Sequence, residues 1–247
     1  MLNEPTLEKL RTMRLDGMAT SWLEQQKDTG TTKLSFDERF GLLVEGEWAF
    51  RENRRLARAL REAKLKLSQA CVEDIDYPTR RELDKAVVRQ LASCRWVQEH
   101  QAILITGATG TGKTYIACAL AQQACRKGFR AIYRRASRLF DELRIARADG
   151  TYARVLTRIA RVDVLVIDDF AISPVKDDER RDLLEVLEDR HGTRSTIVTS
   201  QLPPAEWHDY LADPTLADAI CDRILHHAHR LVLQGPSRRK EKLTAEK

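Results

Sequence analysis

The most informative segment of this chain is Ile103-Leu-Ile-Thr-Gly107-Ala-Thr-Gly110-Thr-Gly112-Lys113-Thr114. Its first residues are apolar or β-branched and predict a strand. From Gly107 onward it satisfies the pattern G-x-x-x-x-G-K-[ST], which joins a strand to a helix. Glycines let backbone N–H groups wrap a phosphate without Cβ clashes, and the helix after them points its positive end at the same anion. The segment therefore predicts a phosphate-binding loop.

The side chains of this loop are the first candidates for binding a nucleotide and its metal. We expect Lys113 to reach the β- and γ-phosphates of ATP and the Thr114 hydroxyl to bind Mg²⁺. The alternative is a glycine-rich turn that holds no ligand. The residues expected to bind nucleotide are Gly107, Ala108, Thr109, Gly110, Thr111, Gly112, Lys113, Thr114 and Tyr115.

Two carboxylates follow a second apolar run and are candidates for catalysis. The run Val164–Ile167 ends in Asp168 and Asp169, which places both side chains at the carboxyl end of a predicted strand. We expect Asp168 to bind Mg²⁺ and Asp169 to orient or deprotonate the attacking water. Many ATPases have glutamate at the second position. Aspartate is one methylene shorter, so slow turnover is expected, and surface acids capping a strand are the alternative.

A third polar segment, Thr199-Ser200-Gln201, follows a later apolar run. A polar residue at this strand end can sense the γ-phosphate, and Ser200 and Gln201 are the candidates. The alternative is that they only begin a loop, since such residues are common in turns.

The pattern around these motifs predicts a three-layer α/β domain. Short apolar runs alternate with helical stretches and lack polar alternation, which is typical of a parallel sheet buried on both faces. The expected strands span residues 102–106, 131–133, 162–167, 195–199 and 230–233. The first hundred residues show no strand pattern. There we expect a long helix over about 37–67, capped by Ser35 with Glu38, a turn at 76–79 and a short helix over about 81–92.

Domain bounds follow from this change of pattern. We expect a small all-helical N-terminal domain over 1–70, a linker and lead-in helix over 71–100, the α/β ATPase domain over 101–235 and a basic tail over 236–247.

Composition excludes several classes of protein. The chain has 247 residues, of which 43% are hydrophobic, 32% charged and only 6% aromatic, and the low aromatic share argues against a β-sandwich. No apolar run approaches the roughly 20 residues that span a bilayer, and the N-terminus lacks the pattern of an export signal. The five cysteines include no CxxC pair, which suits a reducing cytoplasm. We expect a cytoplasmic protein with no membrane partner.

Positive charge is concentrated in two stretches, although the net charge of the whole chain is only +5. Residues 51–66 have a local net charge of +5 and residues 126–161 one of +8, which favours a polyanion as partner. Solvated helix faces are the alternative. Few aromatic residues interleave the second stretch, so phosphate contacts to duplex DNA are expected there rather than base stacking. The expected DNA contacts are Arg134, Arg135, Arg138, Arg144, Arg147, Arg154 and Arg158. Residues 51–66 are expected either to bind DNA or to dock a partner.

Four strings together resemble the IstB-like branch of AAA+ ATPases, the bacterial transposition helpers that are close to replicative helicase loaders. They are GATGTGKT (107–114), VLVIDDF (164–170), TIVTSQLPPAEW (196–207) and DAICDRILHHAHRLVLQGPSRR (218–239). The first two are shared by many ATPases, whereas TSQLP-x₂-W combined with DRILHHAH is much more specific. The likeness covers nearly the whole chain.

The resemblance implies an AAA+ fold and an ATP-dependent, DNA-bound homo-oligomer that helps its cognate transposase select target DNA. By this likeness Arg223 matches the arginine finger that reaches a neighbouring subunit's nucleotide, and an ion pair with Asp218 or Asp222 is the alternative. Arg239 matches a basic residue that contacts phosphate, although Pro236 replaces the acidic residue usual nearby. Helicase loading is the main alternative function. A small-molecule P-loop kinase and a DNA-binding protein with a structural nucleotide are two others.

Overall fold

The computed structural model describes residues 3–28, 30–77 and 82–237. It divides into two compact units, Met1–Arg58 and Ala59–Lys247, each of which is described by itself. The expected domain bounds at residues 70, 100 and 235 stay predictions. None of the helices in the described ranges is both long and apolar enough to cross a membrane.

The first unit consists of helices, as expected. They are α1 (Asn3–Thr12), α2 (Asp16–Lys27), the short 3₁₀ helix η1 (Thr31–Lys33) and α3 (Phe36–Ala63), whose last turn belongs to the second unit. Helices α2 and α3 pack very closely, because a Cβ on Gly17 would lie 2.5 Å from the Cβ of Phe50. The expected cap of α3 is confirmed: the backbone N–H of Ser35 donates to Glu38 Oε2 at 2.8 Å, and that of Glu38 donates to Ser35 Oγ at 3.3 Å.

Two expected helix bounds were wrong. The long helix ends at Ala63 rather than near residue 67, because Lys64 takes a left-handed backbone conformation with φ of +50°. The short helix α4 spans Lys85–Ala92 and begins later than expected, because Asp84 caps it by accepting from the backbone N–H of Ala86 at 2.7 Å. Part of the expected turn at 76–79 lies outside the described residues.

The second unit contains a five-stranded sheet in the order β2-β3-β4-β1-β5, and every pairing is parallel. This confirms the predicted α/β fold, and all five expected strands form. They are β1 (Ile103–Gly107), β2 (Ala131–Arg135), β3 (Val164–Phe170), β4 (Ser195–Ser200) and β5 (His229–Leu233). Strand β1 lies between β4 and β5, so the loop that follows it leaves from the interior of the sheet.

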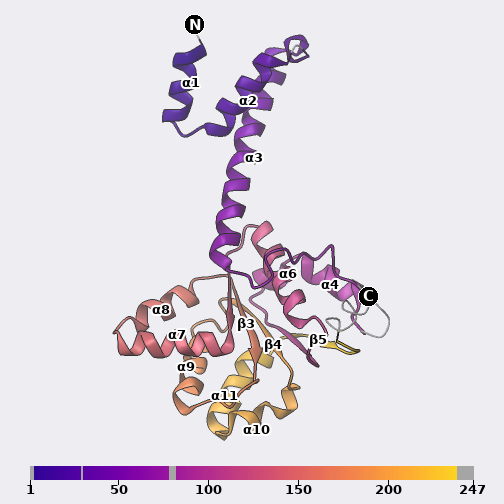
Figure 1. Ribbon diagram of the computed structural model, residues 1–247, viewed down its shortest axis with the longest axis vertical. Coiled ribbons are helices and arrows are strands. Elements are labelled where there is room, and N and C mark those ends of the chain that lie inside the picture. The colour runs from indigo at the N-terminus through magenta and orange to yellow at the C-terminus, as the bar shows by residue number, and fades with distance from the viewer. Residues whose placement is uncertain (1–2, 29, 78–81, 238–247) are drawn as a thin grey trace, which may run out of the picture. The chain divides into compact units, whose positions relative to one another are not determined.

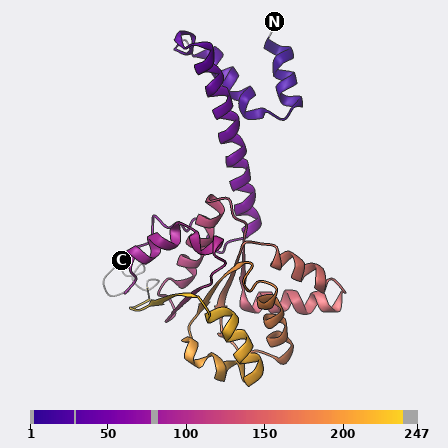
Figure 2. The ribbon, with the colours of Figure 1, turned by 180° about the vertical axis from the view of Figure 1, so that it is seen from behind.

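Helices cover both faces of this sheet (Figures 1 and 2). Helix α6 (Lys113–Arg126) and α4 lie on one face. The other face holds α7 (Ala136–Ala148), α8 (Tyr152–Ala160), α9 (Asp177–Glu188) and α11 (Pro214–Leu225). The remaining elements are α5 (Arg95–Gln98), the 3₁₀ helix η3 (Pro204–Glu206) and α10 (Trp207–Leu211). The largest apolar core lies under the second set, where Phe170 of β3 packs edge-on against Trp207 with ring centroids 4.8 Å apart.

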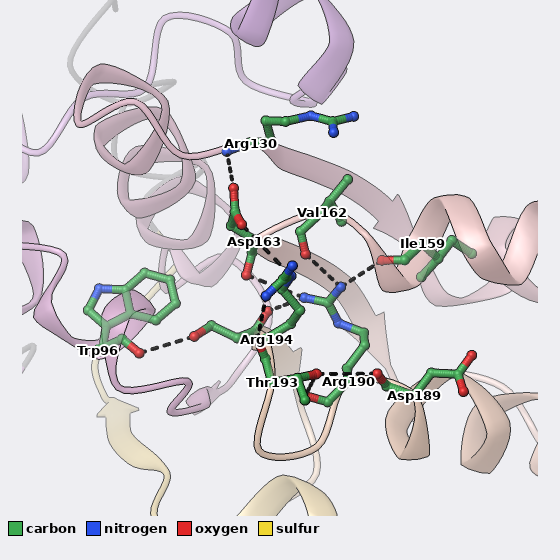
Figure 3. A network of polar contacts seen from close by, with 10 residues as sticks. Trp96, Arg130, Ile159, Val162, Asp163, Asp189, Arg190, Thr193 and Arg194 are labelled. Atoms are coloured by element: carbon green, nitrogen blue, oxygen red, sulfur yellow. Dashed lines mark hydrogen bonds and ion pairs between the residues drawn. The ribbon is translucent and has the colours of Figure 1, made fainter.

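A buried arginine joins three segments at the end of the sheet where strands β3 and β4 begin (Figure 3). Arg190 is only 1% exposed, and its guanidinium donates to the carbonyl oxygens of Ile159 at 2.6 Å, Val162 at 2.9 Å and Ser195 at 2.5 Å. Its Nε donates to Thr196 Oγ1 at 3.2 Å. Burial lowers the pKa of Arg190 to about 9, so the side chain is still charged at neutral pH.

Candidate functional site

The loop between β1 and α6 has the backbone conformation that its glycines predict. Gly107 and Gly112 have φ values of +143° and +99°, which non-glycine residues rarely adopt. A Cβ on Gly107 would lie 2.2 Å from the backbone oxygen of Leu233 on β5, so a side chain there would push the two strands apart. Gly112 immediately precedes α6, whose N-terminal N–H groups therefore face the loop.

Lys113, the first residue of α6, is buried against this loop. Its Nζ donates to the carbonyl oxygens of Gly107 at 2.6 Å and Ala108 at 2.9 Å. The ammonium group is thus held at the loop, beside the backbone N–H groups of the helix start. This combination offers a phosphate group both charge and hydrogen-bond donors.

Asp168 lies at the centre of a buried polar cluster. Its carboxylate is fully buried, accepting from Thr199 Oγ1 at 2.6 Å, Thr114 Oγ1 at 3.0 Å and the Tyr133 hydroxyl at 2.6 Å. Burial and the neighbouring Asp168 raise the pKa of Tyr133, which keeps its hydroxyl protonated and able to donate. The Asp168 carboxylate and the Thr114 hydroxyl are oxygen ligands of the kind that Mg²⁺ prefers, so the donor set fits this metal.

Asp169 stands beside this cluster on an irregular part of β3. Its φ is +60°, and the pairing of β3 with β4 shifts register between Ile167 and Phe170. Backbone strain of this kind is common at functional sites. Its carboxylate lies 3.0 Å from Nε of Arg135 and 3.9 Å from Nζ of Lys66, and its backbone N–H donates to Thr199 Oγ1 at 3.0 Å.

A groove of about 1160 Å³ joins the loop to Asp169. It is somewhat larger than the roughly 300–1,000 Å³ that is typical of ligand pockets. Its walls come from three sources: the loop with the start of α6, the ends of β2, β3 and β4, and the segment that follows α3. The lining residues are Lys66, Leu67, Ser68, Gln69, Ala70, Asp74, Asp76, Thr109, Gly110, Gly112, Lys113, Thr114, Tyr115, Arg135, Asp169, Ile172 and Gln201.

The two candidate sensors lie in different surroundings. Ser200 Oγ accepts from the backbone N–H of Leu202 at 3.1 Å, a contact that caps the turn after β4. Gln201 Oε1 accepts from Thr109 Oγ1 at 2.8 Å and therefore touches the loop itself. Thr199 is the residue of this segment that contacts Asp168, and no local pattern distinguishes it from its neighbours.

Arg223 does not line the groove. It lies on α11, pairs with Glu188 and comes within 3.9 Å of Asp222, one of the two acids that its alternative interpretation named. The hydrogen bond that Arg223 donates to the Glu188 carboxylate raises the pKa of Arg223, so the guanidinium stays charged. It lines a separate pocket of about 380 Å³ with residues that include Arg190 and His226. In one chain, Arg223 and the loop therefore belong to different sites.

The seven arginines expected to contact DNA fall into two groups. Five of them pair with acids of the same chain: Arg134 and Arg158 with Glu142, Arg135 with Asp169, Arg144 with Asp141, and Arg147 with Asp182. Arg138 and Arg154 are exposed, and within the described ranges neither has an acid within ion-pair distance. Arg239, expected to contact phosphate, lies outside the described residues.

Sequence reasoning missed three side chains of the site: Tyr133, Thr199 and Lys66. Tyr133 reaches Asp168 because β2 is the neighbour of β3, where Arg135 pairs with Asp168 in register. Lys66 Nζ lies 3.7 Å from Asp168 Oδ2, although the two residues are far apart in sequence. The only sequence signal for Tyr133 is its position near the end of a predicted strand.

The fold and this cluster define a P-loop protein with a parallel α/β sheet, the class that binds nucleoside triphosphates. The model of the family described as IstB-like ATP binding protein matches residues 8–245, and the chain belongs to this family. The resemblance inferred from the four sequence strings is thereby confirmed.

Relatives and solved structures agree with this assignment. The protein y4pL of Sinorhizobium fredii, which carries the name of an insertion sequence ATP-binding protein, is 47% identical over 240 residues, or 97% of this chain and 98% of that one. The crystal structure of DnaI matches with a TM-score of 0.58 at 22% identity, over 67% of this chain and 92% of DnaI. That of the DnaC helicase loader matches with a TM-score of 0.57 at 20% identity, over 67% and 97%. At these identities the two structures show a common fold alone.

Proposed function

We propose that this chain is an ATP-hydrolysing, DNA-bound assembly factor that helps a transposase select and commit to target DNA. Membership of the IstB-like family and relatives named for insertion sequences support this proposal. The observation that carries the enzymatic part is the meeting of the loop, Thr114 and the fully buried Asp168 at one end of the sheet.

In the proposed reaction, the chain's own groups bind and orient the triphosphate. Backbone N–H groups of the loop and the Lys113 ammonium hold the phosphate oxygens. Thr114 and Asp168 would hold Mg²⁺, which supplies positive charge to the transferring phosphoryl group when it is bound. Asp169 orients the attacking water, and Thr199 keeps both acids in place, since its hydroxyl contacts the Asp168 carboxylate and the Asp169 backbone.

The reaction is completed by a second copy of the chain. Arg223 is separate from the loop of its own chain, so it acts in the proposal on the nucleotide of a neighbouring subunit. Such a head-to-tail contact builds a ring or a helical filament, in which ATP orders the subunit interface on duplex DNA. Arginine suits this role because its planar guanidinium stays charged and can donate two hydrogen bonds to the oxygens of one phosphate group.

Nucleotide binding and DNA-stimulated hydrolysis, measured on three variants, test the proposal. Lys113→Ala is expected to lose ATP binding. Arg223→Ala is expected to keep ATP binding and to lose about 10³- to 10⁵-fold in turnover, as when an arginine finger is removed. Arg95→Ala is the matched control, because it breaks an exposed ion pair that lies outside the groove. In this pair Arg95 Nε is 2.6 Å from Glu99 Oε1. Wild-type turnover in Arg223→Ala would remove this residue from the site.

Affinity capture with a purified transposase and with a purified replicative helicase tests which of these two proteins is the partner. Retention of the transposase in the presence of ATP and DNA supports the proposed role. Retention of the helicase alone would assign the chain to helicase loading instead.

A further inference from the structure

Lys66 lines the groove and brings a positive charge to both acids of β3. Its Nζ lies 3.7 Å from Asp168 Oδ2 and 3.9 Å from Asp169 Oδ2. These are ion-pair distances without a direct hydrogen bond, which needs about 3.2 Å or less between the heavy atoms. The ammonium is therefore attracted to both carboxylates but is fixed to neither.

The backbone that carries Lys66 is anchored on both sides of the residue. Ala63 and Ala70 are buried, and the backbone N–H of Ala70 donates to the carbonyl oxygen of Leu67 at 3.1 Å. Backbone N–H groups of Leu67 and Lys66 also donate to the Cys118 thiol on α6, whose pKa burial nevertheless raises to about 11. The side chain of Lys66 is 42% exposed. Because its four-carbon stem is flexible, the ammonium can move within the groove while its backbone stays in place.

The ammonium lies beside the carboxylate that is expected to bind the metal. Asp168 Oδ2 also accepts from the Tyr133 hydroxyl at 2.6 Å and from Thr114 Oγ1 at 3.1 Å. Thr114 and Asp168 form the donor set that fits Mg²⁺. A divalent cation bound to them would share the Asp168 carboxylate with Lys66, and like charges that close together repel each other strongly where water is partly excluded.

The charge of the entering ligand decides how unfavourable this repulsion is. A free divalent cation adds only positive charge beside Lys66. A divalent cation carried by a nucleoside triphosphate brings anionic phosphate oxygens with it, and the complex is negative overall. The flexible ammonium can then pair with a phosphate oxygen rather than oppose the metal.

We propose that Lys66 makes the groove selective for a metal–triphosphate complex over the free divalent cation. The residue competes with the free cation for the Asp168 carboxylate and gives way to the complex. This inference rests on the proposed function, because it takes Thr114 and Asp168 as the metal-binding groups of the nucleotide site. It adds a specificity-determining residue that lies outside the sequence motifs.

Binding of Mn²⁺ without nucleotide, measured from the electron paramagnetic resonance signal of the free ion, tests the competition. Lys66→Met is expected to bind Mn²⁺ about tenfold more tightly than the wild-type chain, or more, because a positive charge 3.7 Å from Asp168 Oδ2 is removed. Lys66→Arg keeps the charge and should bind Mn²⁺ as weakly as the wild type. Lys64→Met is the matched control, since Lys64 is an exposed lysine of the same segment that does not line the groove.

Two further variants test whether the added affinity arises at the expected metal-binding groups. Asp168→Asn and Thr114→Ala, each combined with Lys66→Met, are expected to return Mn²⁺ affinity to the wild-type level or below. A gain in affinity that survives both substitutions would place the bound Mn²⁺ elsewhere and would overturn the proposal.

The same titration with a non-hydrolysable ATP analogue tests the selectivity. The wild-type chain and Lys66→Met should then bind Mn²⁺ with affinities within about threefold of each other, because the phosphate oxygens neutralise the ammonium. A difference as large as the one without nucleotide would show that Lys66 does not distinguish the complex from the free cation.

The two titrations separate this inference from the proposed function. Equal Mn²⁺ affinities of the wild type and Lys66→Met without nucleotide, together with binding of the analogue, would overturn the role of Lys66 and leave the proposed function intact. Failure of the wild-type chain to bind the analogue would overturn the proposed function, and the selectivity with it.

Discussion

At the scale of single residues, the site is organised by one buried carboxylate. Asp168 is fully buried, and three hydroxyl groups donate to it from α6, β2 and β4. A buried charge is tolerated only when it is paired and hydrogen-bonded, so each donor contributes to stability as well as to geometry. The sequence predicted Thr114 and Asp168 from motif spacing alone. It did not predict Tyr133, which reaches Asp168 only through the neighbouring strand.

Removing the Tyr133 hydroxyl tests this arrangement. Tyr133→Phe is expected to lower the free energy of unfolding by about 1.5–3 kcal/mol, because the lost hydrogen bond went to a charged, buried group. Tyr210→Phe is the matched control, since its hydroxyl donates to the carbonyl oxygen of Ser173 at 2.8 Å, and it should cost about 1 kcal/mol. Urea denaturation of the three proteins measures the difference. An equal loss of unfolding free energy in both variants would show that the hydrogen bond to Asp168 stabilises the fold no more than the one to Ser173.

Glu142 predicts a pH dependence at the same scale. Burial favours a higher pKa for Glu142, but the hydrogen bonds and charges of Arg134 and Arg158 outweigh burial and hold that pKa below its usual range. Because the folded-state pKa is depressed, the stabilisation is fully present above the unfolded pKa of about 4.3 and is lost as pH falls through the folded value.

Glu142→Gln should therefore destabilise the chain at pH 7 and approach wild-type stability at an acidic pH below the depressed folded-state pKa of Glu142. Glu206→Gln, which removes a carboxylate from an exposed position, is the control. Thermal unfolding at both pH values provides the measurement. A stability gap for Glu142→Gln that is the same at the two pH values would contradict the linkage.

At the scale of elements, Arg190 holds together the segments at which strands β3 and β4 begin. Its guanidinium joins the end of α8 to Val162, just before β3, and to the first residues of β4 (Figure 3). Its acceptors are backbone carbonyl oxygens and one hydroxyl rather than carboxylates. No pattern in the sequence indicated that this arginine would be buried. Charged residues are almost never fully buried, so composition alone favours an exposed side chain.

Arg190→Leu is expected to cost about 3 kcal/mol or more, because several buried carbonyl oxygens lose their donor at once. Arg190→Lys should restore little of the lost stability, since one ammonium group cannot reach the several acceptors that the planar guanidinium contacts at once. Arg194→Leu, a neighbour whose side chain is 37% exposed and lies 3.8 Å from Asp163, should cost about 1 kcal/mol or less. Denaturant unfolding would refute this role of Arg190 if the Arg190 and Arg194 leucine variants had equal stability.

At the scale of the whole molecule, internal pairing changes how the basic charge is interpreted. Sequence counting gave residues 126–161 a net charge of +8, yet five of the seven expected DNA-contacting arginines pair with acids of the same chain. Arg138 and Arg154 have no such pair within the described ranges. We therefore expect these two residues to contribute most to binding DNA phosphates.

Salt titration of duplex binding tests this ranking. Each of Arg138→Ala and Arg154→Ala should weaken binding for any duplex sequence and reduce the slope of log affinity against log salt by about one. Arg134→Ala is the matched control from the same stretch, and it should lower stability more than it lowers affinity, because Arg134 supports Glu142. An unchanged slope in both exposed variants would exclude them from the DNA contact.

The sequence by itself determined the phosphate loop, the five strands and the two acids near the end of β3, because these features depend on spacing within short segments. Periodicity and glycine positions act over a few residues, so they can be read without knowing the fold. The neighbours of each strand, the burial of Arg190 and the partners of the basic stretch depend on contacts between distant segments. Local patterns do not specify the order β2-β3-β4-β1-β5, and it is this order that brings Tyr133 and Thr199 to Asp168.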